Sequence, residues 1–183
     1  ANLRCEYLTD PLGIDVVKPR LSWIMESGRR GERQTAYQVL VASTLELLSG
    51  NTGDLWDSGE AASGLSSQVE YAGKPLTSQM PCYWKVRVWD KDGTVSAWSA
   101  PARWSMGLLQ AADWGGAQWI GDDAPENIPS PLLRKSFVIN KAVKRALVCA
   151  TAHGAYELYL NGKRVGDHIL APGPPLVRVL DDQ

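Results

Sequence analysis

Glu157 and Asp167 are the residues whose types and positions come closest to an acid–base pair. Two carboxyl groups about 6.5–9.5 Å apart can act as general acid and general base on a substrate held between them. They lie on either side of Asn161-Gly162, which predicts a two-residue β-hairpin, because both residues tolerate the positive φ of a type I′ turn. The turn would pair Leu160 with Lys163, Leu158 with Val165 and Tyr156 with Asp167. Glu157 then faces away from Asp167, so we expect solvated strand residues and no catalytic residue in this chain.

Two other patterns resemble metal sites. His153 and His168 are the only histidines, and two histidines without further ligands cannot make a closed zinc site. The sequence Asp90-Lys-Asp-Gly resembles the start of a calcium loop, but the third ligand and the closing glutamate are absent. We therefore expect a hairpin turn at Asp90–Gly93 and no metal or other cofactor.

Charge and composition exclude several classes of protein. The net charge is −1 and the one basic run, Arg29-Arg-Gly-Glu-Arg, is short, so we expect no nucleic-acid partner. No apolar run approaches the roughly 20 residues that span a bilayer, so we expect no membrane partner. Three scattered cysteines, Cys5, Cys82 and Cys149, cannot form a complete disulfide framework. No serine, histidine and acid set with a nucleophile-elbow signature is present.

Aromatic side chains leave one binding chemistry open, which is stacking on the C–H face of a sugar. The chain has eight Trp and six Tyr but only one Phe. The candidates for an exposed stacking face are Tyr159, Trp56 and Trp114, with Trp89 and Trp98 also considered. Tyr159 is the best of them, because it lies on the hairpin face opposite Tyr156, Leu158 and Val165, which we expect to face the core. Arg164 opposite Tyr159 could instead cover the ring by a cation–π contact.

The elements that would position these residues are β-strands. Three segments alternate apolar and polar residues, with inward faces predicted as Leu21, Trp23 and Met25, then Tyr37, Val39 and Val41, then Trp84, Val86 and Val88. Lys85 and Arg87 would point outward, and Trp98 and Trp104 would pack along the last strand. A short helical turn is predicted at 44–48, capped by Ser43 or Thr44 and ended by Gly50.

About seven strands in about 107 residues predict an all-β chain that begins with an antiparallel β-sandwich of the fibronectin-III or immunoglobulin type. We place this domain at residues 1–108. A second β domain is predicted at 114–183, with strands at 133–139 and 146–151 before the hairpin. It is too short for the eight strands of a jelly roll, and prolines in Ala171-Pro-Gly-Pro-Pro would interrupt pairing. The second domain is therefore predicted to be a partial jelly roll whose continuation is missing.

Several stretches resemble the amino-terminal region of bacterial α-L-rhamnosidases. They include Asn2-Leu-Arg-Cys-Glu-Tyr-Leu, Asp10-Pro-Leu-Gly-Ile-Asp, Pro19-Arg-Leu-Ser-Trp, Tyr83-Trp-Lys-Val-Arg-Val-Trp-Asp, Trp119-Ile-Gly and Leu158-Tyr-Leu-Asn-Gly-Lys-Arg-Val-Gly-Asp. The resemblance covers the chain in order to about Pro172. It implies a fibronectin-III-like sandwich followed by the opening of a jelly roll. It also implies a parent enzyme that hydrolyses terminal α-L-rhamnose with inversion, through carboxylates in a separate helical barrel further along the chain.

The sequence is therefore interpreted as a non-catalytic amino-terminal fragment of a rhamnosidase-like glycoside hydrolase, inactive by itself. Its expected partners are the remainder of the parent enzyme and rhamnose-containing glycans. The resemblance favours a periplasmic or extracellular location, although the first residues show no signal peptide. Two other classes stay open. One is a stand-alone carbohydrate-binding module and the other is a fibronectin-III-like protein-interaction module.

Overall fold

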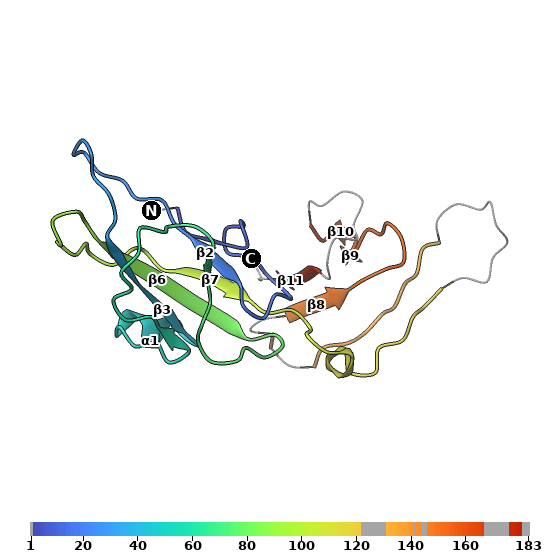
Figure 1. The fold of residues 1–183 in the computed structure, drawn as a ribbon. Helices are drawn as coiled ribbons and strands as arrows, with labels where there is room; N and C mark the ends of the chain where they lie inside the picture. Colours follow the sequence, from blue (N-terminus) through green and yellow to red (C-terminus); the bar gives the residue numbers. More distant parts are fainter. Residues whose placement is uncertain (1, 122–130, 141, 144–145, 167–175, 181–183) are drawn as a thin grey trace.

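The computed structural model describes residues 2–121, 131–140, 142–143, 146–166 and 176–180, the last as backbone alone. The regular secondary structure of the described residues is almost entirely β-strand, with one short α-helix and one 3₁₀ turn (Figure 1). None of its helices combines the length and the apolar character that a membrane span requires.

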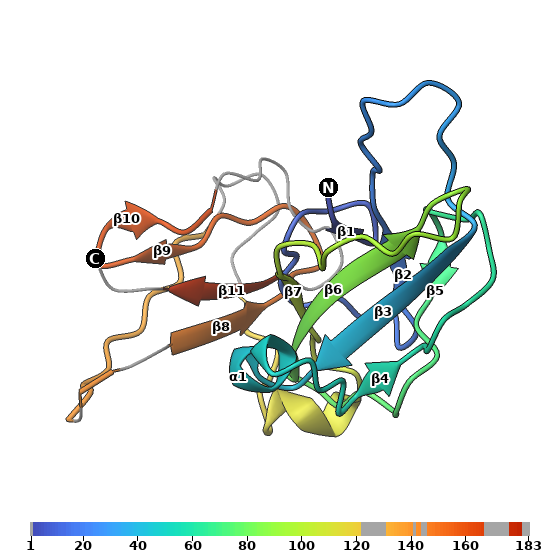
Figure 2. The same ribbon diagram turned by 90° about the vertical axis from the view of Figure 1, so that its left-hand side faces the viewer.

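Two antiparallel sheets form a sandwich within residues 2–106. The smaller sheet has the order β1-β2-β5, made of Arg4–Cys5, Arg20–Ser22 and Val69–Glu70. The larger has the order β4-β3-β6-β7, made of Trp56–Asp57, Ala36–Ala42, Pro81–Trp89 and Ala102–Ser105. The seven strands of this part confirm the predicted all-β, immunoglobulin-like sandwich, and the long β3 and β6 dominate it (Figure 2).

The core between the sheets is built from the predicted inward faces. In the β3–β6 register Val39 lies opposite Val86, and Val41 lies opposite Trp84. All four side chains are buried, because alternate residues of a strand point to the same face of the sheet. Leu21 and Trp23 of the smaller sheet close the core from the other side, as predicted. Trp104 is buried in the same core, while Trp98 packs on the outer face of the larger sheet.

Two predicted orientations are wrong. Met25 is exposed, because the strand ends at Ser22 and the chain leaves the sheet after Trp23. Lys85 was expected in solvent but is buried, because α1 (Leu45–Ser49) covers the outer face of β6. Its Nζ donates hydrogen bonds to the Leu48 carbonyl oxygen and to Asn51 Oδ1, both at 2.6 Å. Burial lowers the pKa of Lys85.

The helix itself was predicted correctly. Thr44 is the N-cap and its hydroxyl accepts a hydrogen bond from the Leu47 N–H, while Gly50 ends the helix. Leu48 packs on Leu40 and Ala42, which point to the outer face of β3. The larger sheet is therefore covered on both faces, by the smaller sheet on one and by α1 on the other.

The free edge of β7 is closed by the segment 10–14. The Arg103 N–H donates to Asp10 Oδ1 at 2.8 Å, and the Ser105 N–H donates to the Pro11 carbonyl oxygen at 3.0 Å. Ile14 pairs with Met106 in a parallel bridge. An open edge invites pairing with another chain, so this segment protects the sandwich from edge-to-edge association.

Beyond the sandwich the structure has a 3₁₀ turn and two antiparallel strand pairs. The turn η1 is Ala111–Trp114, and the pairs are β8 (Ala146–Ala150) with β11 (Leu176–Leu180), and β9 (Tyr159–Leu160) with β10 (Lys163–Arg164). The strand predicted at 133–139 is not observed: residues 131–140 form no strand, because no other described segment pairs with them. The predicted interruption at Ala171–Pro175 lies outside the described residues, and β11 follows it.

Candidate functional site

The β9–β10 hairpin presents Tyr159, the strongest sequence candidate, on its solvent face. Asn161 and Gly162 have φ of 48° and 79°, which confirms the type I′ turn. The register is also confirmed, since Leu160 pairs with Lys163 and Tyr159 pairs with Arg164. Tyr156, Leu158 and Val165 are half-buried on one face, and Tyr159 is 53% exposed on the other.

Three polar groups meet on that exposed face. The Tyr159 hydroxyl donates to Glu157 Oε2 at 2.7 Å, and Arg164 Nη2 lies 3.1 Å from Glu157 Oε1. The hydrogen bond to Glu157, followed by the charge of that carboxylate, raises the pKa of Tyr159. Glu157 is thus engaged with its neighbours in the sheet. Its proposed partner in an acid–base pair, Asp167, lies outside the described residues.

The other two sequence candidates lie on other elements. Trp56 of β4 is partly buried against the sandwich core, and its ring meets the Tyr71 ring edge to face with centroids 5.5 Å apart. Trp114 is half-buried at the end of η1, where Gly115 adopts a left-handed conformation. The structure therefore does not assemble Tyr159, Trp56 and Trp114 into one binding face.

Trp89 and Trp98 are engaged by cations on the outer face of β6. The Arg87 guanidinium lies 4.7 Å from the Trp98 ring centroid and 5.3 Å from that of Trp89. Lys85 Nζ approaches Trp98 at 5.1 Å. These contacts use the ring faces that a sugar would need.

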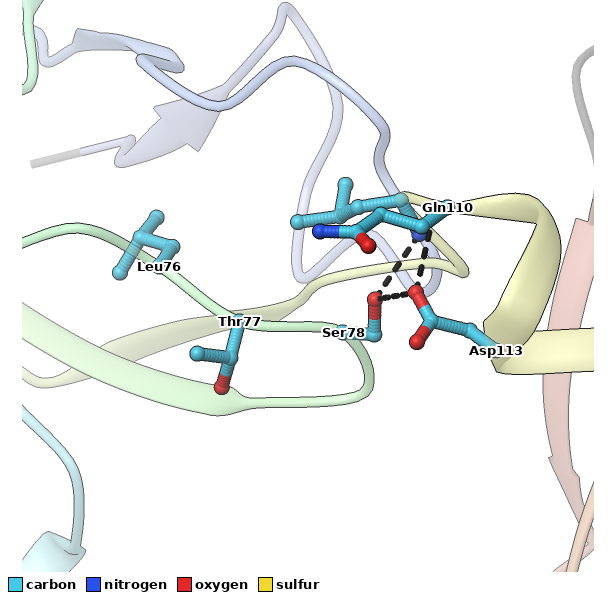
Figure 3. Close-up of a pocket in the computed structure, with 6 residues that line it drawn as sticks. Leu76, Thr77, Ser78, Gln110 and Asp113 are labelled. Atoms are coloured by element: carbon cyan, nitrogen blue, oxygen red, sulfur yellow. Dashed lines mark hydrogen bonds between the residues drawn. The ribbon is translucent and has the colours of Figure 1, made fainter.

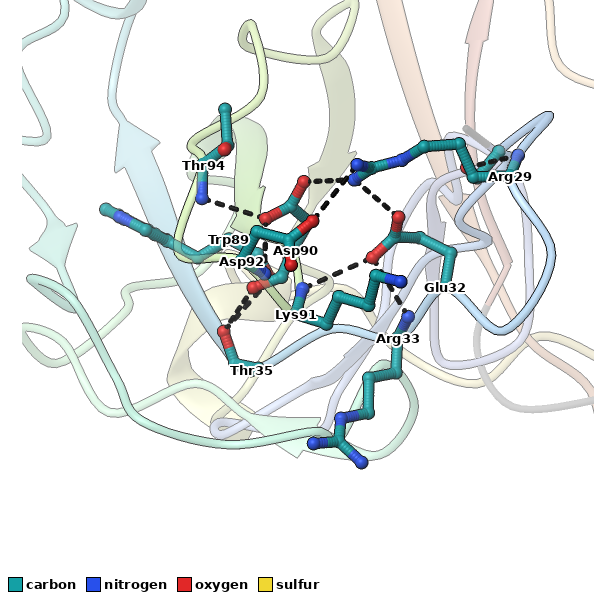
Figure 4. Close-up of polar contacts among 10 residues, drawn as sticks. Arg29, Glu32, Arg33, Thr35, Trp89, Asp90, Lys91, Asp92 and Thr94 are labelled. Atoms are coloured by element: carbon teal, nitrogen blue, oxygen red, sulfur yellow. Dashed lines mark hydrogen bonds and ion pairs between the residues drawn. The ribbon is translucent and has the colours of Figure 1, made fainter.

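The predicted calcium-like sequence forms a turn, as expected (Figure 4). Asp90 Oδ1 accepts hydrogen bonds from the N–H groups of Asp92 and Thr94, at 2.9 and 2.8 Å. Arg29 Nη2 lies 2.5 Å from both Asp90 and Glu32, and Arg29 Nη1 lies 3.1 Å from Asp92. Arg29, the first residue of the basic run, is therefore ion-paired with three acidic side chains. Within the described part of the chain, no group of histidine, cysteine and acidic side chains is arranged to hold a metal ion.

Carboxyl groups with displaced pKa values give no indication of a general acid. A carboxyl group that acts as a general acid near neutral pH needs a pKa raised above its usual value, so that it remains protonated. Backbone N–H groups, first that of Thr94, hold the pKa of Asp90 below its usual value. The pKa is also lowered at the other described carboxyls that shift, which are Glu6, Glu32, Glu46, Asp54 and Asp113. These six carboxyl groups are held in their charged form by hydrogen bonds and ion pairs within the fold.

Sequence reasoning did not find one aromatic contact. Trp119 and His153 stack with ring centroids 4.0 Å apart and an interplanar angle of 26°. Trp119 keeps 64% of its surface exposed. The two residues are 34 positions apart, and no local pattern relates them.

Comparison with known families matches both parts of the chain. The family model described as "Rha78A-like, N-terminal immunoglobulin domain" matches residues 1–110. The model described as "Alpha-L-rhamnosidase N-terminal domain" matches residues 141–176.

Relatives that match by sequence are much longer than this chain. An α-L-rhamnosidase of Formosa agariphila is 36% identical over 188 residues, which covers 91% of this chain and 20% of the relative. An α-L-rhamnosidase of Streptomyces avermitilis is 51% identical over 120 residues, which covers 66% of this chain and 11% of the relative.

Solved structures give the same result. The α-L-rhamnosidase from Dictyoglumus thermophilum superposes with a TM-score of 0.87 at 37% identity, over 99% of this chain and 23% of that one. The Streptomyces avermitilis α-L-rhamnosidase complexed with L-rhamnose gives a TM-score of 0.65 at 34% identity, over 99% of this chain and 20% of that one. The chain thus spans less than a quarter of the length of these relatives. It belongs to the family of Rha78A-like N-terminal immunoglobulin domains and corresponds to the amino-terminal region of α-L-rhamnosidases.

Proposed function

We propose that this chain is the non-catalytic amino-terminal module of a rhamnosidase-like glycoside hydrolase. Its role is to pack against the remainder of the parent polypeptide and so support hydrolysis of terminal α-L-rhamnose there. The module has two units, a sandwich at 1–108 and the opening of a jelly roll at 114–183. The end of β7 at Ser105 and the start of η1 at Ala111 support this division.

Exposed apolar residues in one segment are the observation that carries the proposal. Five large apolar side chains are exposed within the ten residues 131–140: Leu132, Leu133, Phe137, Val138 and Ile139. Leu132 is 97% exposed and Val138 is 84% exposed. A concentration of this kind marks a surface that another element covers. Residues 131–140 also form no strand with any described segment, so the covering element can add a strand to them.

A charge in this segment tests the role directly. In a mixture of this chain with the separately produced remainder of the parent polypeptide, Val138→Glu should weaken complex formation at least about tenfold. The reason is that burying a large apolar side chain contributes roughly 1.5–3 kcal/mol, and 1.4 kcal/mol corresponds to a factor of ten. Isothermal titration calorimetry measures the affinity.

Leu65→Glu is the matched control, since Leu65 is a 63% exposed apolar residue of the sandwich and not of the segment. It should leave the affinity within a factor of two or so of the unaltered chain, as a surface substitution changes free energies by about 0.5 kcal/mol or less. Equal affinity for the Val138→Glu and unaltered chains would contradict the proposal.

A second candidate function is carbohydrate binding on the hairpin. It is favoured by the exposed Tyr159 ring, with Glu157 and Arg164 beside it to hydrogen-bond sugar hydroxyls. Rhamnose offers a methyl group and C–H faces for the ring.

Affinity electrophoresis in rhamnose-rich polysaccharide separates this candidate from a purely structural role. If the hairpin binds sugar, the chain is retarded, and Tyr159→Ala abolishes the retardation. Tyr7→Ala is the control, because Tyr7 is a similarly exposed tyrosine of the sandwich. Unretarded migration of the unaltered chain, or retardation that survives Tyr159→Ala, rules out a sugar site on the hairpin.

A further inference from the structure

The segment that leaves the sandwich is hydrogen-bonded to the loop 76–80, which precedes β6. The Gln79 N–H donates to the Gly107 carbonyl oxygen at 3.0 Å, and the Met106 N–H donates to the Met80 carbonyl oxygen at 2.9 Å. Gly107 also lies against Gly13, so closely that a Cβ at Gly107 would be 2.8 Å from the Gly13 carbonyl oxygen. Gly107, the first residue of the segment 107–119 that leaves the sandwich, is therefore fixed against the sandwich.

Ser78, in the same loop, attaches the residues that follow Gly107 (Figure 3). Its hydroxyl accepts a hydrogen bond from the Leu109 N–H at 2.9 Å and donates one to Asp113. The same Asp113 carboxylate accepts a hydrogen bond from the Gln110 N–H at 2.9 Å. The hydrogen bond from Ser78 is the main cause that lowers the pKa of Asp113, so the carboxylate is charged at neutral pH. Ser78 and Asp113 thus fix the start of η1 on the sandwich.

A hollow of about 340 Å³ lies beside these residues, lined by Leu76, Thr77, Ser78, Leu109, Gln110 and Asp113. A pocket that binds a ligand presents polar groups free to converge on it. Here the Ser78 hydroxyl and one Asp113 oxygen are engaged with each other and with the backbone of the outgoing segment. The geometry favours a joint within the chain over a ligand site.

Two contacts carry the attachment to the second unit. The pKa of Cys149 in β8 is raised by burial, and a hydrogen bond with the Gln79 side chain opposes that rise. Gln79 has a φ of 60°, a left-handed conformation that is uncommon for residues other than glycine. The second contact is the Trp119–His153 stack, in which Trp119 follows η1 and His153 follows β8. The loop therefore contacts β8, and the outgoing segment is joined to the residues after β8 by the Trp119–His153 stack within the second unit.

We infer that the loop 76–80 and residues 107–119 form a rigid joint, which fixes the orientation of the second unit relative to the sandwich. In this arrangement Ser78 and Asp113 are positioning residues. The sandwich then acts as a fixed support for the exposed segment 131–140. If the connection were flexible, the two units could reorient relative to each other. Each binding event would then lose the conformational entropy of that motion, which would weaken binding.

Nitrogen-15 relaxation of the chain by itself tests the joint, because it needs neither a partner nor a substrate. In the unaltered chain, residues of β3 and β6 should share one rotational correlation time with residues of β8 and β9. Ser78→Ala and Asp113→Asn should each remove this agreement and leave β8 and β9 with a shorter time. Gln79→Asn should act in the same direction, since asparagine tolerates the left-handed backbone but is too short to reach Cys149.

Asp92→Asn is the matched control, because it removes an ion pair with Arg29 in the turn after β6, outside the joint. It should preserve a single correlation time. Two correlation times in the unaltered chain would overturn the joint, as would a single time in all three joint variants. Either result would leave the proposed packing role of segment 131–140 to be decided by its own binding experiment.

Discussion

Trp84→Ala is expected to lower the free energy of unfolding of the sandwich by about 3–5 kcal/mol, the usual cost of deleting a fully buried tryptophan. Trp84 has no exposed surface and lies in the middle of β6, between Val41 of β3 and Ala102 of β7. The substitution leaves a cavity where both sheets meet. Since small domains are stable by only about 5–15 kcal/mol, much of the native population should be lost. Urea unfolding followed by far-ultraviolet circular dichroism measures the change.

Trp84→Phe is the control for this prediction. The indole Nε1 of Trp84 is buried and has no hydrogen-bond partner among the residues that the structure describes. Phenylalanine keeps most of the apolar volume and removes that unpaired donor, whose burial costs about 1–3 kcal/mol. The phenylalanine variant should therefore lose less than half of what the alanine variant loses. An alanine variant as stable as the unaltered chain would show that the core is not where the structure places it.

Gln34→Leu should be the second most damaging of the substitutions considered, at about 2–4 kcal/mol. Gln34 is buried, and its amide links residues 63–65 to Trp23 of the core. Its Nε2 donates to the carbonyl oxygens of Ser63 and Leu65 at 3.0 and 2.7 Å, and its Oε1 accepts from Trp23 Nε1 at 3.0 Å. Leucine has a similar size but leaves these three groups without their partner. Urea unfolding again gives the loss.

Gln38→Leu is the matched control on the outer face of the larger sheet. Gln38 also bonds two side chains, Arg87 and Asp57, but water can reach both of them. Its replacement should cost less than about 1 kcal/mol, because solvent replaces the lost hydrogen bonds. Equal losses for the two leucine variants would contradict the structural role assigned to Gln34.

Local patterns predicted the parts of the fold that depend on neighbouring residues. The Asn161-Gly162 turn follows from the positive φ that both residues tolerate, and its register follows from the turn length. The helix cap at Thr44 follows from its hydroxyl and the apolar residues after it. The alternation that buries Val39 and Val86 follows from the two-residue period of a strand.

Features that depend on distant segments could not be predicted in this way. The burial of Lys85 depends on α1, which lies about 40 positions earlier in the chain. The segment at Asp10 closes β7 across more than 90 positions. Leu133–Ile139 has the composition of a strand, but composition does not supply the partner that a strand needs.

The candidate site was predicted only in part. The solvent exposure of Tyr159 follows from the hairpin register, so it could be predicted from the sequence. The packing of Trp56 on Tyr71 could not, because it depends on how β4 meets the loop after β5. The Trp119–His153 stack and the Ser78–Asp113 hydrogen bond join residues with no local relation, so no sequence pattern indicated either.

Our central proposal is that the substrate bond is broken by groups outside this chain. Hydrolysis of an aryl α-L-rhamnoside by the purified chain tests that claim most directly. We expect a rate equal to that of buffer at every pH at which the chain is folded. Turnover that rises in proportion to chain concentration, and persists through repeated purification, would contradict it.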